Sequence, residues 1–163
     1  MRILGIDPGI ATTGFGIIDK LGSKHQILAY GIISTPAKTA LSKRLASLSA
    51  NLKKLIIDYK PDFMAVEELF FNNNAKTALI VGQARGVILL ASEDNNIPVF
   101  TYTPLQVKMA VSGYGHADKK QVQYMVKHLL NLDKIPKPDD AADALAIAIC
   151  HGHSYNSSLA RIK

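Results

Sequence analysis

Four carboxylates stand at positions from which they could act together. Asp7 ends the first predicted strand of the chain, and Glu67 ends a short, continuously apolar strand much later. If these two strands are parallel neighbours, both side chains emerge at the same edge of the sheet, which is where α/β proteins carry their sites. Asp140 and Asp143 are three residues apart at the start of the last predicted helix, so they share one face near a helix end that favours anions.

A cluster of four carboxylates predicts bound metal, because ionised groups in contact repel one another unless cations lie between them. Ligands that offer only oxygen indicate a hard cation such as Mg²⁺, for which Mn²⁺ should substitute. Two ions roughly 3.5–4 Å apart are the usual device for phosphodiester hydrolysis. We therefore expect two Mg²⁺ ions per site, one activating a water for in-line attack and one stabilising the departing 3′ oxygen, with a 5′ phosphate on the product.

Each acid also has an ordinary structural interpretation, as a turn residue, a helix cap or a solvated strand end. Two details favour a functional cluster: Asp143 is followed directly by apolar residues, and no polar residue precedes Glu67 within its strand. Acids that close to a core need partners. Asp139 could take the place of Asp140, since an i, i+4 spacing to Asp143 also gives a shared face. Glu68 competes with Glu67, and the alternation of side chains along a strand lets only one of the two join the cluster.

The elements that must position these acids begin with strands. Residues 2–7, 14–18 and 25–34 have the pattern of three strands joined by short turns, which implies an antiparallel meander. Apolar residues at helical spacing then predict a helix over residues 40–59. The strand over residues 63–66 follows this helix, so it is a candidate parallel neighbour of the first strand.

The second half of the chain is predicted to be mainly helical. A helix over residues 75–94 precedes a strand over 98–101, which completes a five-stranded mixed sheet flanked by helices. Asp118 and Gln121 have the spacing of a capping box at the start of a further helix, and the last helix runs from about residue 139 to 151.

Small residues recur in the helix over residues 75–94. Ala78, Gly82 and Gly86 are spaced four apart, and an interior glycine costs a helix about 1 kcal/mol relative to alanine, so something should pack closely there. Ordinary contact between this helix and the sheet is the favoured explanation, and a dimer seam is the alternative.

Length and composition indicate one packed domain. The chain has 163 residues, of which 48% are hydrophobic and 20% charged, which excludes a disordered or fibrous protein. We expect a single domain over residues 1–153. Residues 154–163 are polar and without periodicity, so they are predicted to form a flexible C-terminal tail.

The same composition limits location and partners. A single cysteine excludes an internal disulfide framework and suits a reducing cytoplasm. The longest apolar run, residues 144–150, is far shorter than the roughly 20 residues that a spanning helix needs, and the acid at position 7 interrupts any signal peptide. We therefore expect a soluble cytoplasmic protein. Its formal net charge of +6 favours polyanionic partners but does not distinguish nucleic acid from a merely basic surface.

Taken together, four motifs give the sequence a family resemblance. They are Gly5-Ile6-Asp7-Pro8-Gly9, Ala65-Val66-Glu67, Gly82-Gln83-Ala84-Arg85-Gly86 and Asp140-Ala141-Ala142-Asp143-Ala144-Leu145-Ala146. In order and separation they resemble the RuvC family of Holliday-junction resolvases, the crossover junction endodeoxyribonucleases, over nearly the whole chain. The resemblance implies a ribonuclease-H-like fold, a homodimer, and magnesium-dependent cutting of four-way DNA junctions in recombination and repair.

The resemblance also implies roles for individual residues. It assigns catalysis and metal binding to Asp7, Glu67, Asp140 and Asp143. Phe70, in the loop after Glu67, would contact a base, and Lys108 and Lys119 would contact backbone phosphates. A branch-migration helicase complex of the RuvA–RuvB type is the implied protein partner.

Two other classes of protein compete with this interpretation. Gly5-Ile6-Asp7 followed by Thr12-Thr13-Gly14 also resembles the phosphate loop of actin-like and sugar-kinase-like ATP-binding domains. Length argues against that class, because those proteins pair two such domains around the nucleotide. A non-catalytic nucleic-acid-binding module would keep the fold and the basic surface, and the complete set of acids argues against it.

Overall fold

The protein is seen here in a computed structural model, which describes residues 1–68 and 75–155, with the side chains of residues 75 and 76 excepted. Along the chain the elements are β1 (Arg2–Asp7), β2 (Thr12–Leu21), β3 (Lys24–Ser34), α1 (Leu41–Tyr59), β4 (Phe63–Glu67), α2 (Ala75–Glu93), β5 (Val99–Tyr102), α3 (Pro104–Ser112), α4 (Lys119–Leu129) and α5 (Asp139–Ser154).

The strands form one mixed sheet in the order β3-β2-β1-β4-β5. β1, β2 and β3 pair antiparallel, which confirms the predicted meander. β4 lies parallel to β1, with Val66 opposite Ile6, and β5 lies parallel to β4. The predicted neighbourhood of the first and fourth strands is therefore confirmed, because the helix α1 provides the crossover that a parallel pair requires.

The second strand is longer than predicted. Residues 19–21 were expected to turn, yet they continue the ladder, and the turn is reduced to residues 22 and 23, where Gly22 has a positive φ of 61°. The prediction is wrong here because backbone pairing does not require apolar side chains. Asp19 also gains an ion pair, its Oδ1 lying 2.9 Å from Nε of Arg2 on the adjacent strand.

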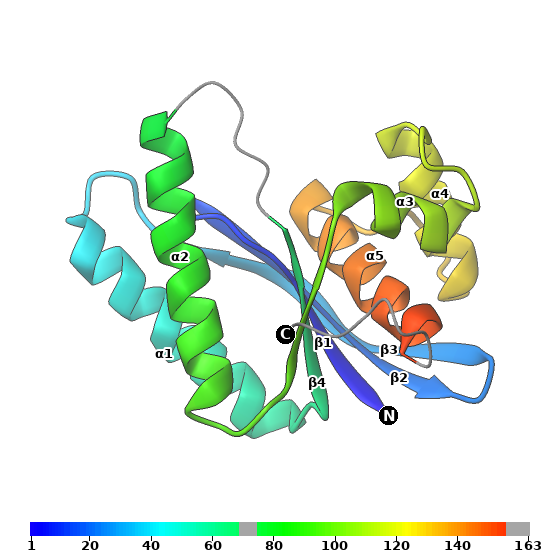
Figure 1. The fold of residues 1–163 in the computed structure, drawn as a ribbon, viewed down its shortest axis with the longest axis horizontal. Helices are drawn as coiled ribbons and strands as arrows, with labels where there is room; N and C mark the ends of the chain where they lie inside the picture. The colour runs from blue at the N-terminus through cyan, green and yellow to red at the C-terminus, as the bar shows by residue number, and fades with distance from the viewer. Residues whose placement is uncertain (69–74, 156–163) are drawn as a thin grey trace.

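Helices cover both faces of the sheet, and Figure 1 shows the layers. α1 and α2 lie on one side, while α5, with α3 and α4 against it, lies on the other. Each side has its own apolar cluster: Leu48, Leu52 and Ile88 belong to the first, and Val107, Val126 and Leu145 to the second. Cys150 is fully buried in the second cluster, as expected of a core thiol.

Helix α5 packs unusually close to the sheet, because the strands beneath it carry glycine where it crosses. A Cβ at Gly5 would collide with the backbone of Ala144, and one at Gly14 would collide with the backbone carbonyl of Asp140. A Cβ at Gly16 would lie 2.9 Å from the Cα of Leu145. The helix contributes small alanines to the same interface. This close contact fixes the start of α5 over the ends of β1 and β2.

Helix α2 differs from its prediction at the two glycines. A Cβ at Gly82 or Gly86 would meet open space, so contact with the sheet is the wrong explanation for these residues. The face of α2 that packs inward carries Ala84 and Ile88, which are both fully buried. Gly82 and Gly86 lie on the opposite face, where Leu79 and Leu90 are more than half exposed; these four residues are called the outer face of α2 below.

Three further predictions can be placed. The capping box of Asp118 and Gln121 is present at the start of α4. Among the described residues, no helix is long and apolar enough to cross a membrane. The last helix continues to Ser154, about a turn beyond the predicted end. The division into a domain of residues 1–153 and a tail stays a prediction, since residues 156–163 lie outside the described residues.

Candidate active site

Two of the predicted acids are brought together by the sheet. Asp7 is the last residue of β1 and Glu67 the last of β4, and the pairing of Ile6 with Val66 places the two acids side by side at the same edge. Both are half-buried, whereas Glu68 is exposed. The alternation of the strand therefore turns Glu67 toward the protein and leaves Glu68 in solvent.

Helix α5 brings the other two acids to this edge. Ligand oxygens of Asp7, Asp140 and Asp143 all lie within 4.8 Å of one another, which is close enough for a shared cation. The close packing of α5 against Gly14 holds Asp140 there, and the i, i+3 spacing adds Asp143 on the same face. Asp139, the alternative to Asp140, is not part of this group; its carboxylate forms ion pairs with Lys137, whose Nζ lies 2.7 Å from Oδ1 of Asp139, and with Lys119.

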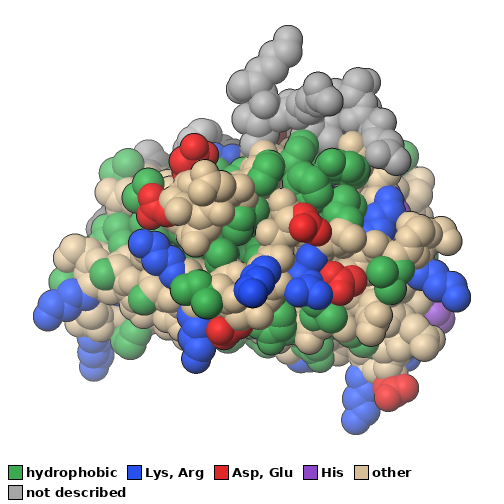
Figure 2. Space-filling model, turned by 90° about the horizontal axis from the view of Figure 1, so that it is seen from below, with side chains coloured by type: hydrophobic (Ala, Val, Ile, Leu, Met, Phe, Trp, Pro, Cys, Tyr) green, Lys and Arg blue, Asp and Glu red, His purple; other side chains and the backbone are tan. Residues whose placement is uncertain are grey.

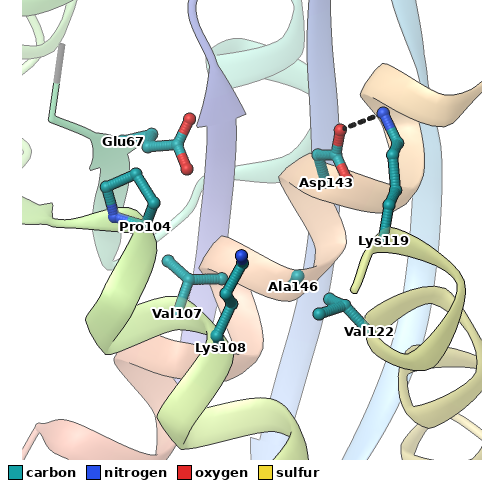
Figure 3. Close-up of a pocket in the computed structure, with 8 residues that line it drawn as sticks. All are labelled: Glu67, Pro104, Val107, Lys108, Lys119, Val122, Asp143 and Ala146. Atoms are coloured by element: carbon teal, nitrogen blue, oxygen red, sulfur yellow. Dashed lines mark hydrogen bonds and ion pairs between the residues drawn. The ribbon is translucent and has the colours of Figure 1, made fainter. Parts of the chain in front are cut away.

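A pocket of about 200 Å³ opens beside this cluster. Its polar lining consists of Glu67 and Asp143 with two lysines, Lys108 from α3 and Lys119 from α4. Figure 3 shows the two carboxylates on opposite sides of the pocket, with Lys108 pointing toward the space between them. The rest of the lining is apolar and consists of Pro104, Val107, Val122 and Ala146.

Burial and neighbouring negative charge make ionisation of the clustered carboxylates unfavourable. Burial, together with the charges of Glu67, Asp143 and Asp140, raises the pKa of Asp7 to about 7. Burial likewise raises the pKa of Glu67, with Asp143 adding to the effect, and burial raises the pKa of Asp143 against the opposing influence of Lys119. Such mutual elevation marks a site that would be relieved by a cation.

Both lysines that were predicted to bind phosphate line this pocket, but only Lys119 forms ion pairs with acids of the described residues. Lys108 is half-buried, and its charge opposes the rise in the pKa of Glu67. Lys119 is the first residue of α4, and its Nζ lies 3.0 Å from Oδ2 of Asp143 and 3.5 Å from Oδ2 of Asp139. Phe70, the predicted base contact, lies outside the described residues.

The positive charge of the chain is not gathered into one patch on the face that Figure 2 shows. Lys and Arg side chains are spread along that face, with Asp and Glu between them. The net charge of +6 supplies a general attraction for polyanions, and the lysines of the pocket add a local positive charge.

Comparison with known proteins adds a family to this geometry. A family model described as Crossover junction endodeoxyribonuclease RuvC matches residues 3–151. Proteins of that name from Alkaliphilus oremlandii and Halothermothrix orenii are 57% and 58% identical to this chain; the alignments cover 96% and 95% of this chain and 95% and 94% of the relatives. The chain belongs to the RuvC family. The predicted resemblance is thereby confirmed.

The RuvC fold is matched in solved structures as well. RuvC of T. thermophilus in complex with a Holliday junction substrate superposes with a TM-score of 0.94 at 36% identity, over 99% of this chain and 98% of that one. A yeast mitochondrial Holliday junction resolvase, 18% identical with a TM-score of 0.66 over 93% of this chain and 78% of that one, shares the fold. The ribonuclease-H-like α/β prediction is confirmed, and an actin-like ATP-binding domain or a non-catalytic module is not favoured.

Sequence reasoning missed two features of this RuvC site. The first is the set of glycines beneath α5, whose signal was visible as Gly5, Gly14 and Gly16 next to the apolar residues of two strands. The second is the pairing of Lys119 with Asp143. These residues are 24 positions apart on different helices, so no local pattern could have revealed their contact.

Proposed function

We propose that this RuvC-family chain is a structure-selective, metal-dependent endonuclease that resolves four-way DNA junctions by symmetric phosphodiester hydrolysis. The observation that carries the proposal is the convergence of Asp7, Asp140 and Asp143 within 4.8 Å, with Glu67 across the adjoining pocket. Family membership supports the substrate, since a relative of 36% identity is described in complex with a Holliday junction.

The residues of the site fit divalent metal. The donor set consists only of carboxylate oxygens, which suits Mg²⁺ and, as a substitute, Mn²⁺. Burial first, and neighbouring carboxylates second, raise the pKa values of Asp7, Glu67 and Asp143, so a bound cation would favour their ionised forms. We assign Asp7, Glu67, Asp140 and Asp143 as the ligands of two ions per site. When bound, Mg²⁺ supplies charge for the phosphate in the transition state and a nucleophilic water at neutral pH.

The protein's own groups would prepare the scissile phosphate for attack. Asp7, at the shared edge of β1 and β4, lies among the other three acids and couples to each of them electrostatically. Lys108 reaches toward the space between Glu67 and Asp143, where its ammonium can bind a phosphate oxygen opposite the carboxylates. The apolar side of the pocket keeps this contact partly shielded from solvent, which strengthens it.

A homodimer would give one assembly two such sites. Two strands of a junction related by a twofold axis match the twofold symmetry of a dimer. The outer face of α2 supports an interface there, because Leu79 and Leu90 are 66% and 61% exposed and the glycines between them leave room for close approach. We further propose a cytoplasmic location and a branch-migration helicase of the RuvA–RuvB type as partner.

The test of the catalytic proposal offers the purified protein a synthetic four-way junction and a linear duplex of the same sequence, with Mg²⁺ or with EDTA. We expect paired cuts in the junction, with Mg²⁺ only, and 5′ phosphates on the products. Asp7→Asn should lower the cleavage rate at least about 100-fold while the variant still binds the junction. Asp58→Asn, which removes an exposed acid of α1, is the matched control and should cut normally. Equal cleavage by both variants would reject the assignment.

The dimer is tested by sedimentation equilibrium of the wild type and of Leu79→Lys. A charge placed on the outer face of α2 should raise the dimer dissociation constant by at least about tenfold, because it must be desolvated on association. Leu21→Lys, at a similarly exposed leucine at the end of β2, is the control. A dimer that forms equally well with lysine at position 79 places the interface elsewhere.

A further inference from the structure

The ammonium of Lys119 contacts the edge of the carboxylate cluster, where positive charge stabilises the ionised acids. Its Nζ lies 3.0 Å from Oδ2 of Asp143 and 3.5 Å from Oδ2 of Asp139, and the first of these contacts is drawn in Figure 3. Asp143 is one of the three acids whose oxygens lie within 4.8 Å of one another. Lys119 therefore neutralises one edge of the cluster while the rest of it remains underneutralised.

This placement runs against the local preference of the helix. Lys119 is the first residue of α4, where the helix dipole disfavours positive charge. Burial lowers the pKa of its ammonium, but the hydrogen bond and charge of Asp143, with a contribution from Asp139, more than offset that effect and raise the pKa. The ion pairs with Asp143 and Asp139 thus hold the ammonium beside the cluster.

We propose that Lys119 serves as a placeholder cation: its ammonium occupies the edge of the carboxylate cluster in the metal-free protein and withdraws from Asp143 when a divalent ion binds. The inference rests on the proposed metal site. Withdrawal frees the ammonium for the phosphate contact predicted for it. One side chain would thereby couple metal binding to readiness for substrate, without any movement of the backbone.

The physical argument is competition for one carboxylate. A divalent ion held by Asp143 would share that carboxylate with the ammonium of Lys119, and two cations so close together would repel each other. The lysine can respond at low cost, because its side chain is 51% exposed and has a flexible four-carbon stem. Lys108 provides the contrast: it lines the same pocket, yet no ion pair joins it to an acid of the described residues.

Calorimetric titration of the junction-free protein with Mn²⁺ at pH 7.5 tests the competition. Lys119→Met should tighten Mn²⁺ binding about two- to fivefold, the range expected from removing a half-exposed ion pair. Lys120→Met is the matched control, because it removes the same charge from the next residue of α4, which is also exposed. Its Mn²⁺ affinity should change by less than the Lys119 variant's. Equal effects of the two substitutions, or weaker Mn²⁺ binding by Lys119→Met, would overturn the proposal.

A second measurement uses the unaltered chain, so it does not depend on whether a variant folds. Acetylation of lysines by a limiting amount of acetic anhydride, read by mass spectrometry, should label Lys119 more strongly when Mn²⁺ is present, with Lys120 as the internal reference. Unchanged labelling of Lys119 by a protein that binds Mn²⁺ rejects the placeholder role alone. Mn²⁺ binding that is absent, or that survives unchanged in Asp7→Asn, rejects the metal site itself.

Discussion

The α-carbon of Gly14 faces the backbone carbonyl of Asp140 so closely that no side chain fits between them. This contact joins β2 to the first turn of α5, and it lies directly beneath the acids that α5 contributes. Because residue 14 of β2 has no side chain, Asp140 can approach the sheet closely enough to lie near Asp7. Backbone packing, rather than any hydrogen bond between side chains, holds the halves of the cluster together.

Gly14→Ala should consequently damage stability and activity together. The added methyl group would meet backbone that cannot rotate away, so the start of α5 must move, at a cost of about 1–3 kcal/mol in the free energy of unfolding. The same shift separates Asp140 from Asp7, and junction cleavage should fall by at least about 100-fold. Urea unfolding and the junction assay measure the two effects.

Gly31→Ala is the control for this substitution. Gly31 is also a strand glycine, but a Cβ there would meet only the ring of Phe15, at 3.1 Å. The ring can yield by a few tenths of an ångström, so stability should change by less than about 1 kcal/mol and cleavage should persist. If the two alanine variants behave alike, the contact between Gly14 and Asp140 does not position the site.

The salt dependence of junction binding should show whether Lys108 contacts a phosphate. Lys108→Met is expected to weaken junction binding in EDTA and to reduce the slope of log affinity against log salt by about one. Lys54→Met, at an exposed position of α1 on the other side of the sheet, should leave that slope nearly unchanged. Fluorescence anisotropy with a labelled junction, measured from about 50 to about 300 mM salt, gives both slopes. A slope that Lys108→Met leaves intact would remove this residue from the binding surface.

Much of the site could be predicted because its acids end regular elements. Asp7 and Glu67 each close an apolar strand, and a single crossover helix between those strands makes them parallel neighbours with a common edge. The spacing of Asp140 and Asp143 needed only the period of a helix. For these residues the local sequence pattern was therefore enough to predict where the side chains lie in the fold.

Other features could not be predicted, because they depend on how elements pack. Residue spacing alone left Asp139 and Asp140 as alternatives and only the family resemblance favoured Asp140, because the nearness of Asp140 to Asp7 depends on how the start of α5 packs over Gly14. The ion pair of Lys119 with Asp143 depends on the position of α4 against α5. The glycines of α2 were assigned to a contact with the sheet for the same reason, since the sequence does not show which face of the helix turns inward.

A buried polar pair in the core between the sheet and α5 should matter for stability alone. The hydroxyl of Tyr102, at the end of β5, lies 2.7 Å from Nδ1 of His151 in α5, and both side chains are almost completely buried. Tyr102→Phe leaves the imidazole without this partner, so the free energy of unfolding should fall by about 1–2 kcal/mol. Junction cleavage at room temperature should be retained. Tyr124→Phe, at an exposed tyrosine, should be neutral. Equal stability of the two variants would show that the pair contributes nothing.

The raised pKa of Asp7 predicts a pH dependence of stability with a definite sign. In the folded protein this pKa is about 7, whereas its ordinary value is 3.8, so between these values the folded state holds a proton that the unfolded state has released. The contribution of Asp7 to stability therefore falls as pH rises through this window.

The comparison of wild type with Asp7→Asn in EDTA tests this sign. The free energy of unfolding of Asp7→Asn relative to wild type should increase by on the order of 2 kcal/mol between about pH 4.5 and 8. One pKa unit corresponds to about 1.4 kcal/mol, and the shift is shared among coupled acids. Adding Mg²⁺ at the higher pH should stabilise wild type but not the variant, since only the wild-type cluster gains a ligand that binds the folded state. Urea titrations of both proteins supply the four comparisons, and a stability difference that is independent of pH would contradict the charge imbalance inferred for this cluster.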